Sequence, residues 1–147
     1  MRRVRVLALL EPSRAGRAVI EAAAELTADD VTFVAVAPQA TGPRCGVSIG
    51  DYNAAVVESV ISDLEHAVAE LTAGGGHACA QLIVEGHDPP LERFAASGNF
   101  DLILLPARHS LRAGHHPAAG RLRAVSTAEV RVLGGHRRGV TPGTSAV

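Results

Sequence analysis

The chain has 147 residues, of which 47% are hydrophobic and 20% charged, as expected for one soluble domain large enough to bury a core. Its formal net charge of -1 provides no overall attraction for nucleic acid or for an anionic membrane. Aromatic residues make up 3% of the chain and Trp is absent, so stacking on nucleobases is an unfavourable binding mode. We therefore expect no nucleic acid and no membrane among its partners.

The start of the chain, MRRVRVLALLEPS (1–13), has a basic beginning and an apolar stretch, as signal peptides do. The apolar stretch is short, however, Val alternates with Arg, and no small-residue cleavage site follows it. No apolar run reaches the ~18 residues that a membrane span needs. We interpret residues 4–10 as a first strand and expect a cytoplasmic protein.

The first strand is followed by EPS, in which Pro12 stops the strand and Ser13 is a candidate helix N-cap. Small apolar residues then recur at steps of three and four, which predicts a helix over roughly 14–27. Because the apolar stripe of this helix consists largely of Ala, the helix can lie close to a sheet.

A second apolar strand is predicted at 31–37, and the Pro- and Gly-rich segment 38–50 is predicted to be a loop. The next apolar stripe predicts a long amphipathic helix over 51–73. Three consecutive glycines at 74–76 are typical of the end of a helix.

The second half of the chain continues the alternation of strands and helices. A third strand is predicted at 78–86, a short helix with proline in its first turn at 88–98, and a fourth strand, apolar on both faces, at 101–106. Another helix is predicted at 117–125 and a fifth strand at 128–133.

This alternation predicts an α/β fold, a doubly wound five-stranded parallel sheet with helices on both faces. The near-continuous apolar strands agree, because a parallel sheet is buried on both sides. We assign residues 1–133 to one domain. The C-terminal tail at 134–147 is rich in Gly, Ser and Thr, lacks apolar periodicity, and is predicted to be flexible.

Three stretches in this order resemble a known family. They are VRVLALLEPS (4–13), similar to its first strand and helix start; VEGHDPPLERFAASGNFDLILLP (84–106), similar to its glycine-ended third strand, short helix and fourth strand; and AEVRVL (128–133), similar to its last strand. The family is that of the universal stress proteins, and the likeness covers about residues 3–133. It implies a Rossmann-like sheet of order 3-2-1-4-5, of the adenine nucleotide alpha hydrolase-like type.

In a sheet of that order the direction of winding reverses between the first and fourth strands. Ligands bind at such a switch point, beyond the carboxyl ends of the strands. The resemblance therefore implies a candidate nucleotide-binding rim formed by Glu11, Pro12, Ser13, Val36, Pro106, Arg108 and His109.

Family members that bind ATP carry a Gly-x-x-Gly-x9-Gly-Ser/Thr motif after the fourth strand, since backbone N–H groups must approach the phosphates closely. The four positions of this motif are held here by Pro106, His109, Ala119 and Gly120. Aligned backwards from the fifth strand, with a shortened loop, the last two positions are held by His116 and Pro117.

Neither alignment restores the motif, and Pro106 also lacks an N–H donor. Glu11 stands where ATP-binding relatives usually carry aspartate. We therefore expect no cofactor. The alternative retains ATP or AMP and replaces the backbone donors by side chains. The candidates for that role are Arg108, His109, Arg112 and Arg121.

His109, His115 and His116 lie in one loop, as the ligands of a metal site can. Adjacent loop histidines seldom converge, however, and no nearby Cys, Asp or Glu completes a ligand set. We expect no metal site and three solvent-exposed histidines. No catalytic motif is present either, and Glu11 has no evident orienting partner as a general base, so we expect no enzymatic activity.

The fifth strand, 128–133, is expected at an edge of the sheet, where unpaired backbone groups favour pairing with another strand. Relatives commonly dimerise through this strand, so the resemblance implies a homodimer. The functional hypothesis is a small stress-protein-like module that acts by dimerisation and contact with an unidentified protein partner, without tight ATP binding. The alternative is a nucleotide-binding stress sensor with an altered loop rich in Arg and His.

Overall fold

The structure, a computed structural model, describes residues 4–12, 14–26, 30–42, 48–108 and 116–133; the predicted tail at 134–147 lies outside this part. The strands in it are β1 (Arg5–Leu9), β2 (Asp30–Ala37), β3 (Ala78–Val84), β4 (Leu102–Pro106) and β5 (Glu129–Leu133). The helices are α1 (Arg14–Glu25), α2 (Ile49–Ala73), α3 (Leu91–Ser97) and α4 (Ala119–Val125). In the described residues no helix is both long enough and apolar enough to cross a membrane.

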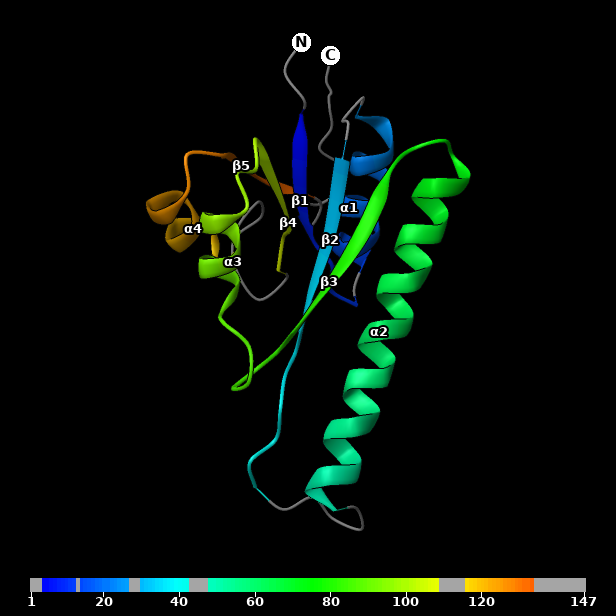
Figure 1. Ribbon diagram of the computed structural model, residues 1–147, viewed down its shortest axis with the longest axis vertical. Helices are drawn as coiled ribbons and strands as arrows, with labels where there is room; N and C mark the ends of the chain where they lie inside the picture. The colour runs from blue at the N-terminus through cyan, green and yellow to red at the C-terminus, as the bar shows by residue number, and fades with distance from the viewer. Residues whose placement is uncertain (1–3, 13, 27–29, 43–47, 109–115, 134–147) are drawn as a thin grey trace.

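The strands form one parallel sheet in the order β3-β2-β1-β4-β5 (Figure 1). The predicted architecture and strand order are thus confirmed. β1 is the central strand, and its residue Ala8 pairs with Phe33 of β2 on one side and with Leu104 of β4 on the other. The winding reverses at β1, so the carboxyl ends of β1, β2 and β4 meet at the predicted switch point.

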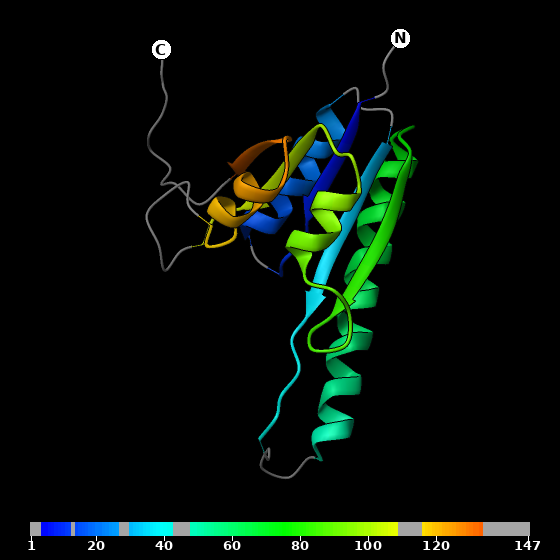
Figure 2. The ribbon, with the colours of Figure 1, turned by 60° about the vertical axis from the view of Figure 1, so that its left-hand side comes forward.

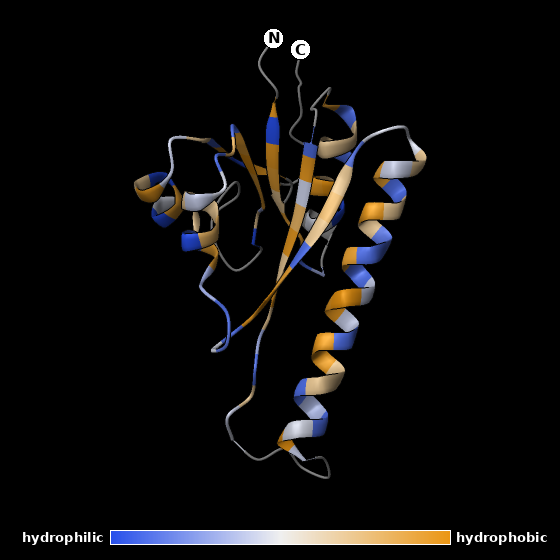
Figure 3. Ribbon diagram, in the orientation of Figure 1, coloured by the Kyte–Doolittle hydropathy of each residue, from blue (hydrophilic) through white to orange (hydrophobic). Residues whose placement is uncertain are grey.

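Helices cover both faces of the sheet, α1 and α2 on one and α3 and α4 on the other (Figure 2). Alternate residues of β1 enter the two cores: Val6 and Ala8 pack under α1 and α2, whereas Leu7 and Leu9 pack under α3 and α4. Apolar residues therefore dominate the central strands in Figure 3. Burial on both faces is the physical reason why the sequence pattern of these strands is continuous rather than alternating.

Three helix starts differ from their predictions, and one of them is that of α4, which was predicted from 117 and begins at Ala119. α2 begins at Ile49 because Ser48 caps it, its Oγ accepting a hydrogen bond from the N–H of Asp51 at 3.0 Å. α3 begins at Leu91 with Pro90 in the N-cap position, so the two prolines precede this helix and do not lie in its first turn.

Candidate functional site

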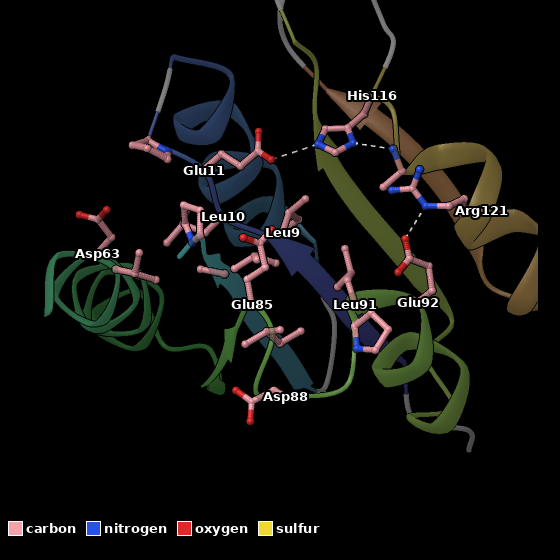
Figure 4. A pocket seen from close by; sticks show the side chains of 18 of the residues that line it. Leu9, Leu10, Glu11, Asp63, Glu85, Asp88, Leu91, Glu92, His116 and Arg121 are labelled. Atoms are coloured by element: carbon pink, nitrogen blue, oxygen red, sulfur yellow. Dashed lines mark hydrogen bonds and ion pairs between the residues drawn. The ribbon is translucent and has the colours of Figure 1, made fainter. Parts of the chain in front are cut away.

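A pocket of about 700 Å³ lies at the carboxyl ends of the strands (Figure 4). Its volume falls within the ~300–1,000 Å³ typical of small-molecule sites. The apolar part of its wall comes from the ends of β1, β2 and β3 and from the first residue of α3. These residues are Leu9, Leu10, Ala35, Val36, Ile83 and Leu91, and Val60 of α2 and Ala118 add to the apolar wall.

One wall of the pocket is a hydrogen-bonded cluster centred on Glu11. The Nη2 atom of Arg108 donates to Oε2 of Glu11 at 2.7 Å, and its Nε lies 3.4 Å from Oε1. The Nε2 atom of His116 lies 3.1 Å from the same Oε2. Both donors come from the segment between β4 and α4. They converge on one carboxylate oxygen of Glu11, as Figure 4 shows for His116.

His116 is 3% exposed, and both of its ring nitrogens are engaged. The backbone N–H of Ala118 donates to its Nδ1 at 3.0 Å, so Nδ1 carries a lone pair and no proton. The proton of the neutral ring is then on Nε2, which donates to Glu11. The short turn from His116 to Ala118 thus fixes both the tautomer and the direction of the imidazole.

Two opposing effects act on the carboxyl group of Glu11. Burial alone would raise its pKa, but hydrogen bonds from His116 and Arg108 together outweigh that effect and hold the pKa below its usual value. The pKa of Arg108 is raised by its hydrogen bond to Glu11. At neutral pH the cluster therefore contains a carboxylate and a guanidinium that compensate each other.

A second ion pair lies across the pocket, between α3 and α4. Nε of Arg121 donates to Oε2 of Glu92 at 2.6 Å, and this hydrogen bond lowers the pKa of the Glu92 carboxyl. Arg121 also donates to the backbone oxygen of Pro117 at 3.3 Å. The guanidinium that reaches the pocket from α4 is thus already bound within the chain.

The remaining charged groups of the wall are carboxylates: Asp63 of α2, and Glu85 and Asp88 after β3. Asp88 accepts a hydrogen bond from the N–H of Val84 at 2.7 Å, and the intervening turn contains Gly86 at φ 84°, a conformation that favours glycine. Counting Glu11 and Glu92, five carboxylates and two guanidinium groups line the pocket.

The backbone of Glu11 is held close to the first turns of α1. A Cβ atom at Gly16 would lie 1.9 Å from the carbonyl oxygen of Glu11, so only glycine permits this approach. The segment that carries the Glu11 side chain is therefore positioned by backbone contact with a helix as well as by hydrogen bonds.

Four of the seven candidate rim residues line the pocket, namely Glu11, Pro12, Val36 and Arg108, and so does Arg121, a candidate of the alternative. Pro106 does not. It is the fully buried last residue of β4, paired with Leu133 of β5, and the chain reaches the pocket two residues later. Ser13 and His109, together with Arg112, lie outside the described residues.

The prediction of solvent-exposed loop histidines is wrong for His116, which is buried against Glu11. Glu11 likewise has orienting partners that the sequence did not reveal. His115 lies outside the described part of the chain, in which no group of three or more metal-ligating side chains converges. The contributions of α2 and of the turn after β3 to the pocket were not predicted: the expected rim included no residue of either segment.

No family model matches the chain, and no curated protein matches it. Solved structures do. A protein of the universal stress protein family from Burkholderia pseudomallei matches with a TM-score of 0.68 and 25% identity, over 88% of this chain and 94% of that chain. The universal stress protein from Archaeoglobus fulgidus matches with a TM-score of 0.63 and 20% identity, over 91% and 95%.

Several of the matching structures hold a nucleotide. A universal stress protein family protein from Arabidopsis thaliana with AMP bound matches with a TM-score of 0.59 and 14% identity, over 88% of this chain and 90% of that chain. The Archaeoglobus fulgidus protein is also matched in its complex with dAMP, and a further universal stress protein in complex with cAMP. With the strand order, the switch-point pocket and these matches together, the chain is related to the universal stress protein family and has its α/β fold.

Proposed function

We propose that this chain is a non-catalytic cytoplasmic module of the universal stress protein type, which acts by self-association and contact with a protein partner and does not hold ATP tightly. The observation that carries the proposal is the charge pairing in the pocket. Arg108 and His116 are bonded to Glu11, and Arg121 is bonded to Glu92. A phosphate group would have to displace a carboxylate of the chain to reach any of them.

The backbone at the end of β4 supports the same conclusion. Pro106, at the first glycine position of the family's phosphate-binding motif, has no N–H to offer. The five carboxylates of the pocket wall further oppose an anionic ligand, because like charges in a partly enclosed site are screened poorly.

Calorimetric titration with ATP tests the proposal. We expect a dissociation constant weaker than ~1 mM, equivalent to less than ~4 kcal/mol of binding free energy. We also expect the purified protein to release no stoichiometric adenine nucleotide when it is denatured. A micromolar constant, or released nucleotide, would overturn the proposal.

The second candidate is a nucleotide-binding stress sensor with an altered loop. Two observations favour it: the switch-point pocket has the volume of a small-ligand site, and related structures hold AMP, dAMP or cAMP. In that case Arg108 must release Glu11, or Arg121 must release Glu92, in order to bind phosphate. Alanine at these two positions would then weaken nucleotide binding, whereas under the first proposal there is no tight binding to lose.

Self-association is proposed through β5, which forms one edge of the sheet. Arg131 projects from this strand and would repel its own symmetry mate near a two-fold axis. Its Nε is bonded to Oε2 of Glu129 on the same strand at 2.7 Å, which reduces that repulsion. A homodimer through this edge is therefore compatible with the charges that β5 carries.

A further inference from the structure

We propose that Glu11 is a specificity-determining residue of the pocket: its carboxylate occupies an anion-binding position formed by Arg108 and His116, and thereby excludes ligands that carry a phosphate. This inference rests on the proposed function, since it explains how a pocket of this fold fails to hold ATP. It also assigns a ligand class, because a pocket closed to anions but walled by apolar side chains suits an uncharged, nucleoside-sized molecule.

The geometry of the donors carries the first step. Arg108 Nη2 and His116 Nε2 lie 2.7 and 3.1 Å from a single oxygen of Glu11. Two N–H groups that converge on one anionic oxygen are the arrangement that binds a phosphate oxygen as well as a carboxylate. In this chain the oxygen that the two N–H groups bind is the Oε2 atom of Glu11, and not that of a ligand.

The second step is that His116 is set in place independently of Glu11. His116 is 3% exposed, and the N–H of Ala118 fixes its ring with Nε2 as the donor. Removal of the carboxylate therefore leaves the imidazole N–H still directed at the same position. Glu11 in turn is held by the close approach of its backbone to Gly16.

The third step concerns the rest of the wall. Leu9, Val36, Ile83 and Leu91 provide an apolar surface beside the cluster, and Asp63, Glu85 and Asp88 add negative charge around it. Adenosine has no phosphate and so brings no anion to this cluster. AMP would bring a second anion to the position that Glu11 already fills.

The test compares AMP with adenosine, which differ only by the phosphate, in calorimetric titrations of the full chain. Glu11→Gln removes the charge at nearly constant shape, and Glu11→Ala removes the side chain. In Glu11→Ala we expect AMP to bind at least about tenfold more tightly than in the unsubstituted protein, as two charge-assisted donors become available. In Glu11→Gln, whose amide still fills the position without a charge, we expect a smaller gain for AMP. The affinity for adenosine should be unchanged. Adding Arg108→Ala to Glu11→Ala should abolish the gain.

Glu70→Gln is the matched control. Glu70 also accepts two hydrogen bonds from the guanidinium of an arginine, Arg17, but on α2 and outside the pocket. The substitution removes the same charge from the molecule and should leave AMP binding unaltered. An equal gain in Glu70→Gln, an equal gain for adenosine, or no gain for AMP in either Glu11 variant would overturn the inference.

The two proposals fail in different ways. If the unsubstituted protein binds ATP or AMP at micromolar concentration, the proposed function fails before any variant is compared. If it does not, and the Glu11 variants also show no gain for AMP, only the role of Glu11 is refuted. Thermal unfolding of each variant shows whether it is folded, and the isosteric Glu11→Gln remains available if the alanine variant is not.

Discussion

The carboxyl group of Glu11 links the stability of the protein to pH. Because the folded state holds the Glu11 pKa below its unfolded value of ~4.3, the cluster stabilises the protein at pH values above that value. The contribution is lost as the pH falls through the lower, folded pKa. Below both values, folding gains nothing from the ionised carboxylate.

We therefore expect the free energy of unfolding of the unsubstituted protein to fall more steeply than that of Glu11→Gln as the pH drops below ~4.3. Urea unfolding measured at a series of pH values checks this, and the difference between the two curves isolates Glu11 from the other carboxylates. Parallel curves throughout the acid range would show that Arg108 and His116 do not lower the pKa of Glu11.

Residue-scale contacts of this kind could not be predicted from the sequence. Glu11 and His116 are 105 positions apart, and their contact depends on how β1 and the segment before α4 meet at the edge of the sheet. His116 resembled any loop histidine, since its neighbours are His115 and Pro117. Part of the rim expected from the resemblance could be located, because the ends of apolar strands are visible in the sequence, and Glu11, Pro12 and Val36 at such ends line the pocket.

At the scale of elements, the docking of α1 depends on Gly16. Gly16→Ala places a Cβ atom against the carbonyl oxygen of Glu11, and an overpacked contact of this kind costs about 1–3 kcal/mol. We expect a lower midpoint in thermal unfolding, and a displaced Glu11.

Gly50→Ala is the control. Gly50 is exposed in the first turn of α2 with nothing within 4 Å of its Cβ position, so alanine there should stabilise the protein by up to ~1 kcal/mol. Equal effects at the two glycines would contradict the close approach.

The elements themselves were largely predictable. The nine segments predicted as strands or helices correspond to the nine elements of the described residues, because burial on both faces makes the strands continuously apolar and α2 presents a regular stripe. The errors lie at the ends of elements, among them the starts of α2, α3 and α4. Ser48 begins α2 before the apolar stripe does, and Pro90 occupies the cap of α3.

At the scale of the whole molecule, the proposed dimer depends on the backbone groups at the outer edge of β5. In a parallel strand the N–H and C=O of one residue face the same side, and the side alternates along the chain. The N–H of Glu129 donates to Asp101 and the oxygen of Leu133 accepts from Ala107, both toward β4. The backbone groups of Val130 and Val132 therefore face outward.

Val132→Pro deletes one of these outward N–H groups and leaves the ladder to β4 in place. We expect light scattering at tens of micromolar protein to change from a dimer mass to a monomer mass, with unchanged helical circular dichroism. Ala80→Pro is the matched control, because Ala80 is exposed on β3, the opposite edge, and its N–H also faces outward. A monomer before any substitution, a Val132→Pro dimer, or dissociation by Ala80→Pro instead would exclude β5 as the interface.

The pairing of β1 with β4 has a consequence for synthesis on the ribosome. Arg5 hydrogen-bonds Asp101, 96 positions later, so one side of the central strand has no native neighbour until nearly three quarters of the chain has been made. At ~5–20 residues per second, this apolar strand waits several seconds with an open edge. Nascent chains stalled before residue 102 should therefore be cleaved by protease, or captured by chaperones, far more readily than chains released after β5. The order of translation, as well as the final energy of the sheet, exposes this protein to aggregation.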